Sequence, residues 1–373
     1  MKTLGFYIDF PFCIARCAFC AFDVEGYRVR WATRYIKALE KEIEIYATLS
    51  EITGRKITSV YLGGGTPSHY PPEVLQDLLA HCQNRFNIGE DAEITLETHP
   101  ATVDKNKLSD FLKIGINRLS LGMQSFSNKQ LKQLGRHHSA QEAITAFQDA
   151  REAGFLNISI DLMYGLPNES PEDWEKTLRQ AIALSPEHIS IYALSIEAGT
   201  LFDKKYREGK LNLCSEDTSA TLYDRARKQL ARADYKQYEI SNFAKAGHKS
   251  RHNLRYWNQE AVLSFGVSGH SYIDGKRSVN TDKIPDYIEK LETGKLPVTE
   301  QEKILPRDAA IDHIIFGLRK TEGIPAQTLS EDAIFRETRK SLEDAGLLQE
   351  ESGRIQLTRK GMHFADEVGM AFL

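Results

Sequence analysis

Short apolar runs alternate with amphipathic segments along the first two-thirds of the chain. The apolar runs predict six strands, at residues 5–10, 58–62, 93–97, 118–121, 157–162 and 188–194. Apolar residues at helical spacing predict helices at residues 30–49, 72–82, 104–114, 140–153 and 171–184. Because each strand is followed by helical sequence, we expect a parallel sheet with right-handed crossovers. The pattern therefore predicts an α/β fold, a partial (β/α)6 barrel.

The end of the chain follows a different pattern. After a short strand at residues 237–240, helical segments at residues 309–318 and 333–345 precede a β-ribbon at residues 347–357. The ribbon has turn residues at Ser352-Gly353, and helix, helix and ribbon together predict a small winged-helix-like domain. The expected division is a barrel over residues 1–235, a middle region extending it over residues 236–300, and the C-terminal domain over residues 301–373.

Composition is that of an ordinary globular protein. Of 373 residues, 48 are Lys or Arg and 52 are Asp or Glu, so the formal net charge is −4, and 41% are hydrophobic. This balance argues against a generic nucleic-acid binder. Asp9 and Pro11 interrupt the N-terminal apolar run, and no run approaches the roughly 20 residues that span a bilayer. We expect a cytoplasmic protein.

Three of the five cysteines lie within eight residues, on the loop after the first predicted strand: Cys13, Cys17 and Cys20. Soft thiolates select zinc, copper or iron–sulfur clusters. A structural zinc site usually has four ligands in two separated pairs, and Cys82 and Cys214 are solitary. Three cysteines on a cubane cluster leave one iron open to a small molecule. The alternative, three cysteines packed as small apolar residues, fits poorly with a Pro-Phe-flanked loop at a barrel mouth.

Polar and glycine-rich segments follow the other predicted strands, where a barrel of this kind builds its sites. Gly63-Gly64-Gly65-Thr66-Pro67 follows the second strand, lets the backbone approach a ligand and offers bare N–H groups. Glu97 ends the third strand, Gln124 follows the fourth and Asp161 lies near the end of the fifth. Taken singly, Gln124 could cap a loop, Asp161 could cap a helix and Arg136 could be a solvated charge. Together they predict one polar rim.

The motif Cys-x3-Cys-x2-Cys, with Phe19 directly before its last cysteine, resembles the signature of the radical S-adenosylmethionine (SAM) superfamily. The resemblance implies that the three cysteines hold a [4Fe-4S] cluster, with SAM on its open iron. Reduction of the cluster would cleave SAM to a 5′-deoxyadenosyl radical. The order of further motifs is similar to that of the coproporphyrinogen-oxidase-like branch. By this resemblance the SAM contacts are Tyr7, Gly64, Gly65, Thr66, Glu97, Gln124, Arg136 and Asp161.

Two features distinguish this chain from the oxygen-independent coproporphyrinogen oxidases of that branch. The oxidases carry a fourth cysteine where this chain has Phe22, and they have a longer N-terminal extension. The motif His252-Asn253-x-x-Tyr256-Trp257 resembles one of the HemW-type haem chaperones. That resemblance implies a protein that binds haem and transfers it to an acceptor, a respiratory and membrane-associated protein. Radical-based oxidative decarboxylation of coproporphyrinogen III is the alternative function.

His252 is the candidate haem contact. A neutral imidazole is a common axial ligand of haem iron, and Tyr256 and Trp257 could stack on a porphyrin. The alternative is a histidine satisfied by core hydrogen bonds beside ordinary aromatic packing. A third interpretation makes the C-terminal domain an RNA reader, but acidic residues match its basic ones, so we expect no nucleic-acid partner. The sequence leaves a homodimer open.

Overall fold

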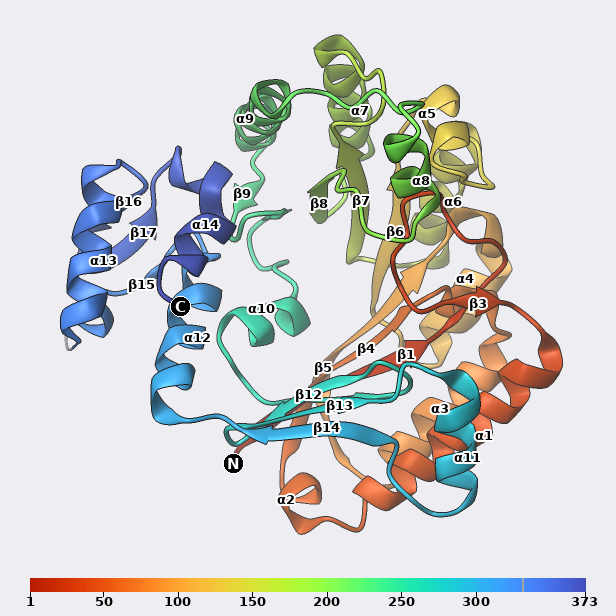
Figure 1. The fold of residues 1–373 in the computed structure, drawn as a ribbon. Coiled ribbons are helices and arrows are strands. Elements are labelled where there is room, and N and C mark those ends of the chain that lie inside the picture. Colours follow the sequence, from red (N-terminus) through yellow and green to blue (C-terminus); the bar gives the residue numbers. More distant parts are fainter. Residues whose placement is uncertain (331) are drawn as a thin grey trace.

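The computed structural model describes residues 1–330 and 332–373, and its centre is a 12-stranded sheet (Figure 1). Six central strands lie in chain order and pair in parallel, which confirms the predicted partial barrel. They are β1 (Thr3–Phe10), β4 (Lys56–Gly64), β5 (Asn87–Thr98), β6 (Arg118–Gln124), β7 (Ile158–Tyr164) and β8 (His188–Ala193). Because these strands are parallel, their carboxyl ends meet at one rim.

Amphipathic helices after the strands bury their apolar stripes against the sheet. The main ones are α1 (Val29–Tyr46), α3 (Pro72–Gln83), α4 (Lys105–Lys113), α6 (Ala140–Ala153) and α7 (Pro171–Leu184). Pro72 and Pro171 stand at the start of their helices, where a missing N–H costs no hydrogen bond. Shorter or later helices are α2 (Ser50–Thr53), α5 (Asn128–Gln133), α8 (Leu201–Arg207), α9 (Glu216–Arg232), α10 (Arg251–Trp257) and α11 (Ile284–Glu292). Within the described residues, no helix combines the length and apolar character that a bilayer crossing requires.

The middle region extends both ends of the sheet. At one end, β10 (Asn242–Ala244) and β9 (Lys236–Gln237) follow β8 in antiparallel pairing. At the other end, β11 (Val262–Phe265) pairs in parallel with β1, and β12 (His270–Ile273), β13 (Lys276–Asn280) and β14 (Val298–Lys303) complete an antiparallel ribbon. The strand expected at residues 237–240 is wrong in its bounds, because residues 238–241 form the connection between β9 and β10.

The central strands carry apolar side chains on one face and polar ones on the other. On β6, Leu119, Leu121 and Met123 are buried in the main hydrophobic cluster, under the helices. The alternate positions Arg118, Ser120, Gly122 and Gln124 all line a cavity inside the barrel. Successive side chains of a strand point to opposite faces, so a period of two separates core from site.

The C-terminal residues have a hydrophobic cluster of their own. Its elements are α12 (Pro306–Leu318), β15 (Ile324–Pro325), α13 (Ala333–Asp344), β16 (Leu348–Glu351), β17 (Arg354–Leu357) and α14 (Ala365–Met370). The expected ribbon appears as β16 and β17, and β15 adds a third strand. Ser352 and Gly353 both have positive φ, 52° and 75°, as a tight two-residue hairpin turn requires. The boundary expected after residue 300 falls within β14, and the domain division stays a prediction.

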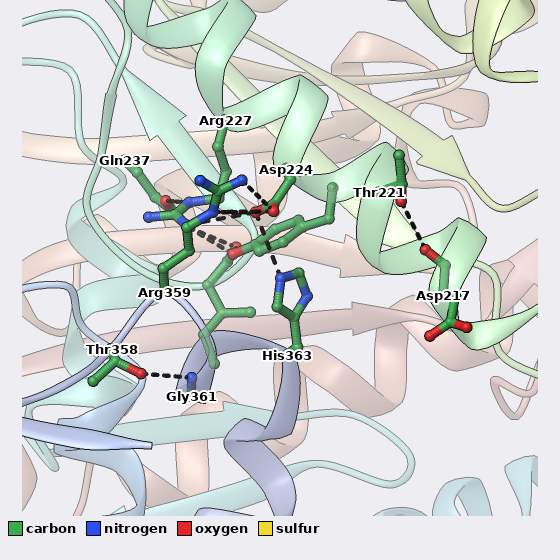
Figure 2. A network of polar contacts seen from close by, with 11 residues as sticks. Asp217, Thr221, Asp224, Arg227, Gln237, Thr358, Arg359, Gly361 and His363 are labelled. Carbon is green, nitrogen blue, oxygen red and sulfur yellow. Dashed lines mark hydrogen bonds and ion pairs between the residues drawn. The ribbon is translucent and has the colours of Figure 1, made fainter. Parts of the chain in front are cut away.

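An ion-pair cluster attaches the C-terminal part to α9 (Figure 2). The Asp224 carboxylate accepts hydrogen bonds from Arg359, whose Nε lies 3.0 Å away, and His363 Nε2 lies 3.5 Å from the same carboxylate. Burial alone would raise the pKa of Asp224, but the hydrogen bond and positive charge of Arg359 outweigh it and lower that pKa. Next to this contact, Tyr223 donates a 2.6 Å hydrogen bond to the Ile240 carbonyl.

Candidate functional site

A cavity of about 270 Å³, which we name the rim cavity, lies at the carboxyl ends of the central strands. Five of those strands and the cysteine loop contribute side chains to its wall. Among the residues predicted from the sequence, it brings together Cys13, Cys17, Cys20, Gly64, Gly65, Thr66, Glu97, Gln124, Arg136 and Asp161. Tyr7 and His252 lie outside this wall.

The cysteine loop begins where β1 ends. Its start forms β2 (Phe12–Cys13), which pairs in parallel with β3 (Glu25–Gly26), so the loop closes on itself. All three thiols are free. Thr66 Oγ1 donates to Cys13 Sγ at 3.3 Å, and Arg136 Nη1 donates to Cys17 Sγ at 3.5 Å. Arg136 is itself oriented by a 2.6 Å hydrogen bond from its Nη2 to the Gly122 carbonyl.

Burial affects the protonation of two thiols of the loop, Cys13 and Cys20. It raises the pKa of Cys13 to about 11 and also raises the pKa of Cys20, so both are thiols at neutral pH. Metal ligation requires thiolates, and loading this loop with metal therefore releases protons. Within the described part of the chain, no three His, Cys, Asp or Glu side chains converge closely enough to hold a single ion. A cubane cluster takes one thiolate per iron, and three separated thiols on one wall suit that demand.

Two buried guanidinium nitrogens on the cavity wall have no hydrogen-bond acceptor among the described residues. They are the Nε atoms of Arg118 and Arg136. An unpaired buried donor is costly, and an anionic group placed in the cavity would satisfy it. The donor set of three thiols and two cations thus fits an iron–sulfur cluster with a carboxylate-bearing ligand beside it.

The glycine-rich segment packs against the cysteine loop. Gly64 has a φ of +98°, in the region that favours glycine, and a Cβ at Gly65 would lie 2.6 Å from the Phe10 carbonyl oxygen. The expectation of bare N–H groups is wrong: Gly64 N donates to Glu97 Oε2 at 3.1 Å and Gly65 N to Phe10 O at 2.8 Å. The Thr66 amide donates to the Phe12 carbonyl at 3.0 Å. The glycines therefore allow close backbone packing rather than leaving free amides.

Two half-buried carboxyl groups, Glu97 and Asp161, line the rim cavity. Glu97 Oε1 also accepts a 2.9 Å hydrogen bond from Tyr61, and burial raises the pKa of Glu97 to about 7 against these hydrogen bonds. Asp161 Oδ2 accepts from Ser120 Oγ at 3.0 Å, and burial likewise raises its pKa. These groups can accept hydrogen bonds from a ligand's hydroxyl or amine groups when ionised.

Arg118 and His99 are cavity residues that the sequence motifs did not assign to SAM. Arg118 opens β6, and its alternation with Ser120 and Gln124 was the available signal. His99 Nδ1 accepts a 3.1 Å hydrogen bond from the Ala101 amide, and burial lowers the pKa of His99 to about 2. The His99 ring is therefore neutral and presents an Nε2–H.

His252 is buried, with 1% of its surface exposed. Its Nδ1 lies 3.0 Å from Ser59 Oγ and its Nε2 lies 3.2 Å from Tyr256 Oη, while its ring stacks on Tyr61 at 5.1 Å. This geometry is that of a histidine held by core hydrogen bonds, with neither ring nitrogen free. Tyr7 also stacks on Tyr61, with 5.8 Å between ring centroids, and its ring centroid lies 6.2 Å from that of His252.

A second cavity of about 380 Å³, the side cavity, adjoins the first. Tyr7 lies in its wall together with Asp9 and Tyr256. The two cavities share Phe22, Val24 and Gly64. Tyr7 thus lines the side cavity rather than the one that the three cysteines line.

Comparison with known proteins agrees with this architecture. The model of the radical SAM superfamily matches residues 7–181, and that of the HemN C-terminal domain matches residues 304–364. The chain is 33% identical to heme chaperone HemW of Bacillus subtilis over 374 residues, covering 98% of both chains. It is also 33% identical to heme chaperone HemW of Haemophilus influenzae, covering 100% of this chain and 98% of that one.

Coproporphyrinogen III oxidase (HemN) from Escherichia coli, described as a radical SAM enzyme, has the same fold. The two structures align with a TM-score of 0.87 at 24% identity, over 100% of this chain and 90% of that chain. The full-length similarity and the shared fold lead to one assignment: the chain belongs to the radical SAM superfamily, in the HemW-type branch of the coproporphyrinogen-oxidase-like family.

Proposed function

We propose that this protein is a haem chaperone that binds a [4Fe-4S] cluster, SAM and haem and transfers haem to an acceptor protein. Similarity over nearly the whole chain to proteins named heme chaperone HemW carries this proposal. The proposed acceptor is a respiratory, membrane-associated haem protein, and the proposed location is the cytoplasm. Phe22, where the oxidases have a fourth cysteine, is 64% exposed in the cavity wall and supports a role other than decarboxylation.

In this proposal Cys13, Cys17 and Cys20 hold the cluster, which supplies one-electron chemistry with SAM when both are bound. Arg136 stabilises the negative charge on Cys17, and its unpaired Nε is available to a ligand carboxylate. Glu97 and Asp161 accept hydrogen bonds from ligand hydroxyl and amine groups. The residues proposed to contact SAM are Tyr7, Gly64, Gly65, Thr66, Glu97, Gln124, Arg136 and Asp161.

The proposed haem segment is the His252-Asn253-x-x-Tyr256-Trp257 motif. Because both ring nitrogens of His252 are engaged in the core, we propose that His252 serves haem binding by orienting Tyr256. Tyr256 is part-exposed, at 37%, and reaches the walls of two cavities. Support for this role comes from that position between the core and the cavities.

One anaerobic experiment separates the chaperone from the oxidase. The chain, reconstituted with iron and sulfide and supplied with SAM and a reductant, is incubated with coproporphyrinogen III. The proposal expects no protoporphyrinogen above the level of a Cys17→Ser variant, together with haemin binding by the same preparation. Sustained formation of protoporphyrinogen and 5′-deoxyadenosine in proportion would overturn the proposal in favour of the oxidase.

A further inference from the structure

A large cavity lies away from the cysteine loop. It has a volume of about 780 Å³ and lies between the antiparallel ribbon β11–β14 and helices α10 and α12. We name it the ribbon cavity. Its size is within the roughly 300–1,000 Å³ that small-molecule and cofactor sites occupy. The two-lobed arrangement of the chain creates it, because α12 begins the C-terminal part that faces the ribbon (Figure 1).

The floor of the ribbon cavity is one face of the ribbon. Tyr272 pairs across the strands with Val262 and with Arg277, and Arg277 pairs with Glu302, so these side chains form one row. His270 pairs with Val279, and Val279 with Glu300, in the neighbouring row. All of these residues line the cavity. The face offers aromatic and aliphatic surface near its centre and carboxylates on β14, the edge strand.

Aromatic side chains form the opposite wall. Tyr256 projects from α10 and Phe316 from α12, and both line the cavity. Phe316 is held by Trp257, whose ring centroid lies 6.4 Å away, and the guanidinium of Arg319 lies 4.7 Å from the Trp257 centroid. In the sequence motif, Tyr256 thus lines the cavity itself, and Trp257 packs against the wall residue Phe316.

His270 is the imidazole that this cavity presents. It is exposed, and no hydrogen bond engages its ring within the described residues. Its backbone is fixed, because Ser264 Oγ donates to the His270 carbonyl at 2.5 Å. His252, in contrast, is buried with both nitrogens engaged. An available imidazole nitrogen is what axial ligation of haem iron requires.

The ribbon cavity connects with the site of the cysteines. His270 and Tyr256 line both the ribbon cavity and the side cavity. The side cavity in turn shares Phe22, Val24 and Gly64 with the rim cavity. A ligand in the ribbon cavity would therefore lie in the last of three adjacent cavities, the first of which the cluster loop lines.

We propose that the ribbon cavity is the haem site and that His270 provides the axial imidazole. The porphyrin would lie between the Tyr272–Val279 face of the ribbon and the Tyr256–Phe316 wall, where flat apolar surface is available on both sides. This inference rests on the proposed function and specifies its site. Tyr256, held by His252, connects the sequence motif to the ligand without requiring the buried imidazole to move.

Charge orients the porphyrin in this site. Glu300 and Glu302 on the edge strand repel the two propionates, and Arg277 is already engaged by Asp312 and Glu302. The propionates therefore face solvent away from β14. Removing charge at this edge by Glu300→Gln should strengthen haemin binding, which is the reverse of what an ordinary loss of structure would do.

The test is a titration of the cluster-loaded protein with haemin, followed by Soret difference spectra and by the ferric haem electron paramagnetic resonance signal. His270→Ala should weaken binding by about tenfold or more and abolish the spectral signature of histidine ligation. His248→Ala, at a part-exposed histidine outside all three cavities, should bind as the wild type does. Val279→Trp, which fills the cavity from its floor, should also lose haemin while keeping its iron content.

The results of this titration distinguish a wrong haem site from a wrong proposed function. If the wild type binds haemin and His270→Ala and Val279→Trp bind it equally well, the ribbon site is wrong and the chaperone proposal stands. If the wild type binds no haemin, the proposed function fails first. His252→Gln should keep the spectral signature of histidine ligation at reduced affinity. Loss of that signature in His252→Gln, with its retention in His270→Ala, would make His252 the ligand and overturn the inference.

Discussion

Arg136 donates a hydrogen bond to the Cys17 thiol, with 3.5 Å between Nη1 and Sγ. The same guanidinium donates through Nη2 to the Gly122 carbonyl on β6, and its Nε has no acceptor among the residues that the structure describes. One side chain therefore links the barrel wall, a cluster thiol and the space for a ligand. We therefore expect the positive charge of Arg136 to affect both the cluster and a ligand bound beside it.

We predict that Arg136→Gln keeps the cluster but binds SAM about tenfold more weakly, because an anionic ligand group loses a charged partner. The cluster should also become harder to reduce, since a positive charge beside Cys17 is removed. Iron content and SAM titrations by optical spectroscopy check the first point, and redox titration checks the second. Arg207→Gln is the comparison, because Arg207 pairs with Asp203 and lies outside the rim cavity. Equal effects of the two substitutions would contradict the assignment.

Cysteine substitutions should divide into two classes. Cys13→Ser, Cys17→Ser and Cys20→Ser should each lower iron and sulfide after anaerobic reconstitution to a small fraction of the wild-type amount, because three thiolates complete the site. Cys214→Ser should load fully, since that thiol lies outside the rim cavity. Iron and sulfide assays measure both classes. Full loading of any loop variant, or failure of Cys214→Ser, would exclude the proposed ligand set.

The strands and the cysteine loop could be predicted because their signals are local. The apolar period of β6 and the spacing Cys13, Cys17, Cys20 are contained in short stretches of chain. The contact of His252 with Ser59 could not be predicted, because Ser59 comes from β4, almost two hundred residues earlier in the sequence. Strand order is equally non-local, and nothing in residues 262–303 shows that they extend the sheet beside β1.

SAM affinity should depend on pH through Glu97. Burial raises the pKa of this carboxyl to about 7, so lowering the pH below 7 protonates it and removes an acceptor for ligand hydroxyls. Affinity should fall by up to about tenfold per pH unit below that value and level off above it. Glu97→Gln should bind weakly at every pH with a flat profile. SAM titrations of both proteins between pH 6 and 8.5 test this role. A SAM affinity of the wild type that is as independent of pH as that of Glu97→Gln would contradict it.

The ion pair between Asp224 on α9 and Arg359 in the C-terminal part should make a small but measurable contribution to the free energy of unfolding. In a double-mutant cycle with Asp224→Asn and Arg359→Gln, we expect a small favourable coupling free energy, because Arg359 is exposed and solvent screens its charge. The Asp224 pKa is lowered, so this contribution is present at neutral pH and is lost as the pH falls through that lowered pKa. Urea unfolding at pH 7 and at acid pH provides the measurement. Coupling that is absent at pH 7, or that grows in acid, would contradict the ion-pair account.

Haem transfer tests the central claim most directly. The cluster-loaded chain is charged with haemin, separated from free haemin and mixed with apomyoglobin, and the Soret band of holomyoglobin is followed over time. A haem chaperone should bind haemin and deliver it to the apoprotein in proportion to the haem loaded, with no change to the porphyrin. A chain that binds no haemin, or that retains it indefinitely while converting coproporphyrinogen III, would contradict the account.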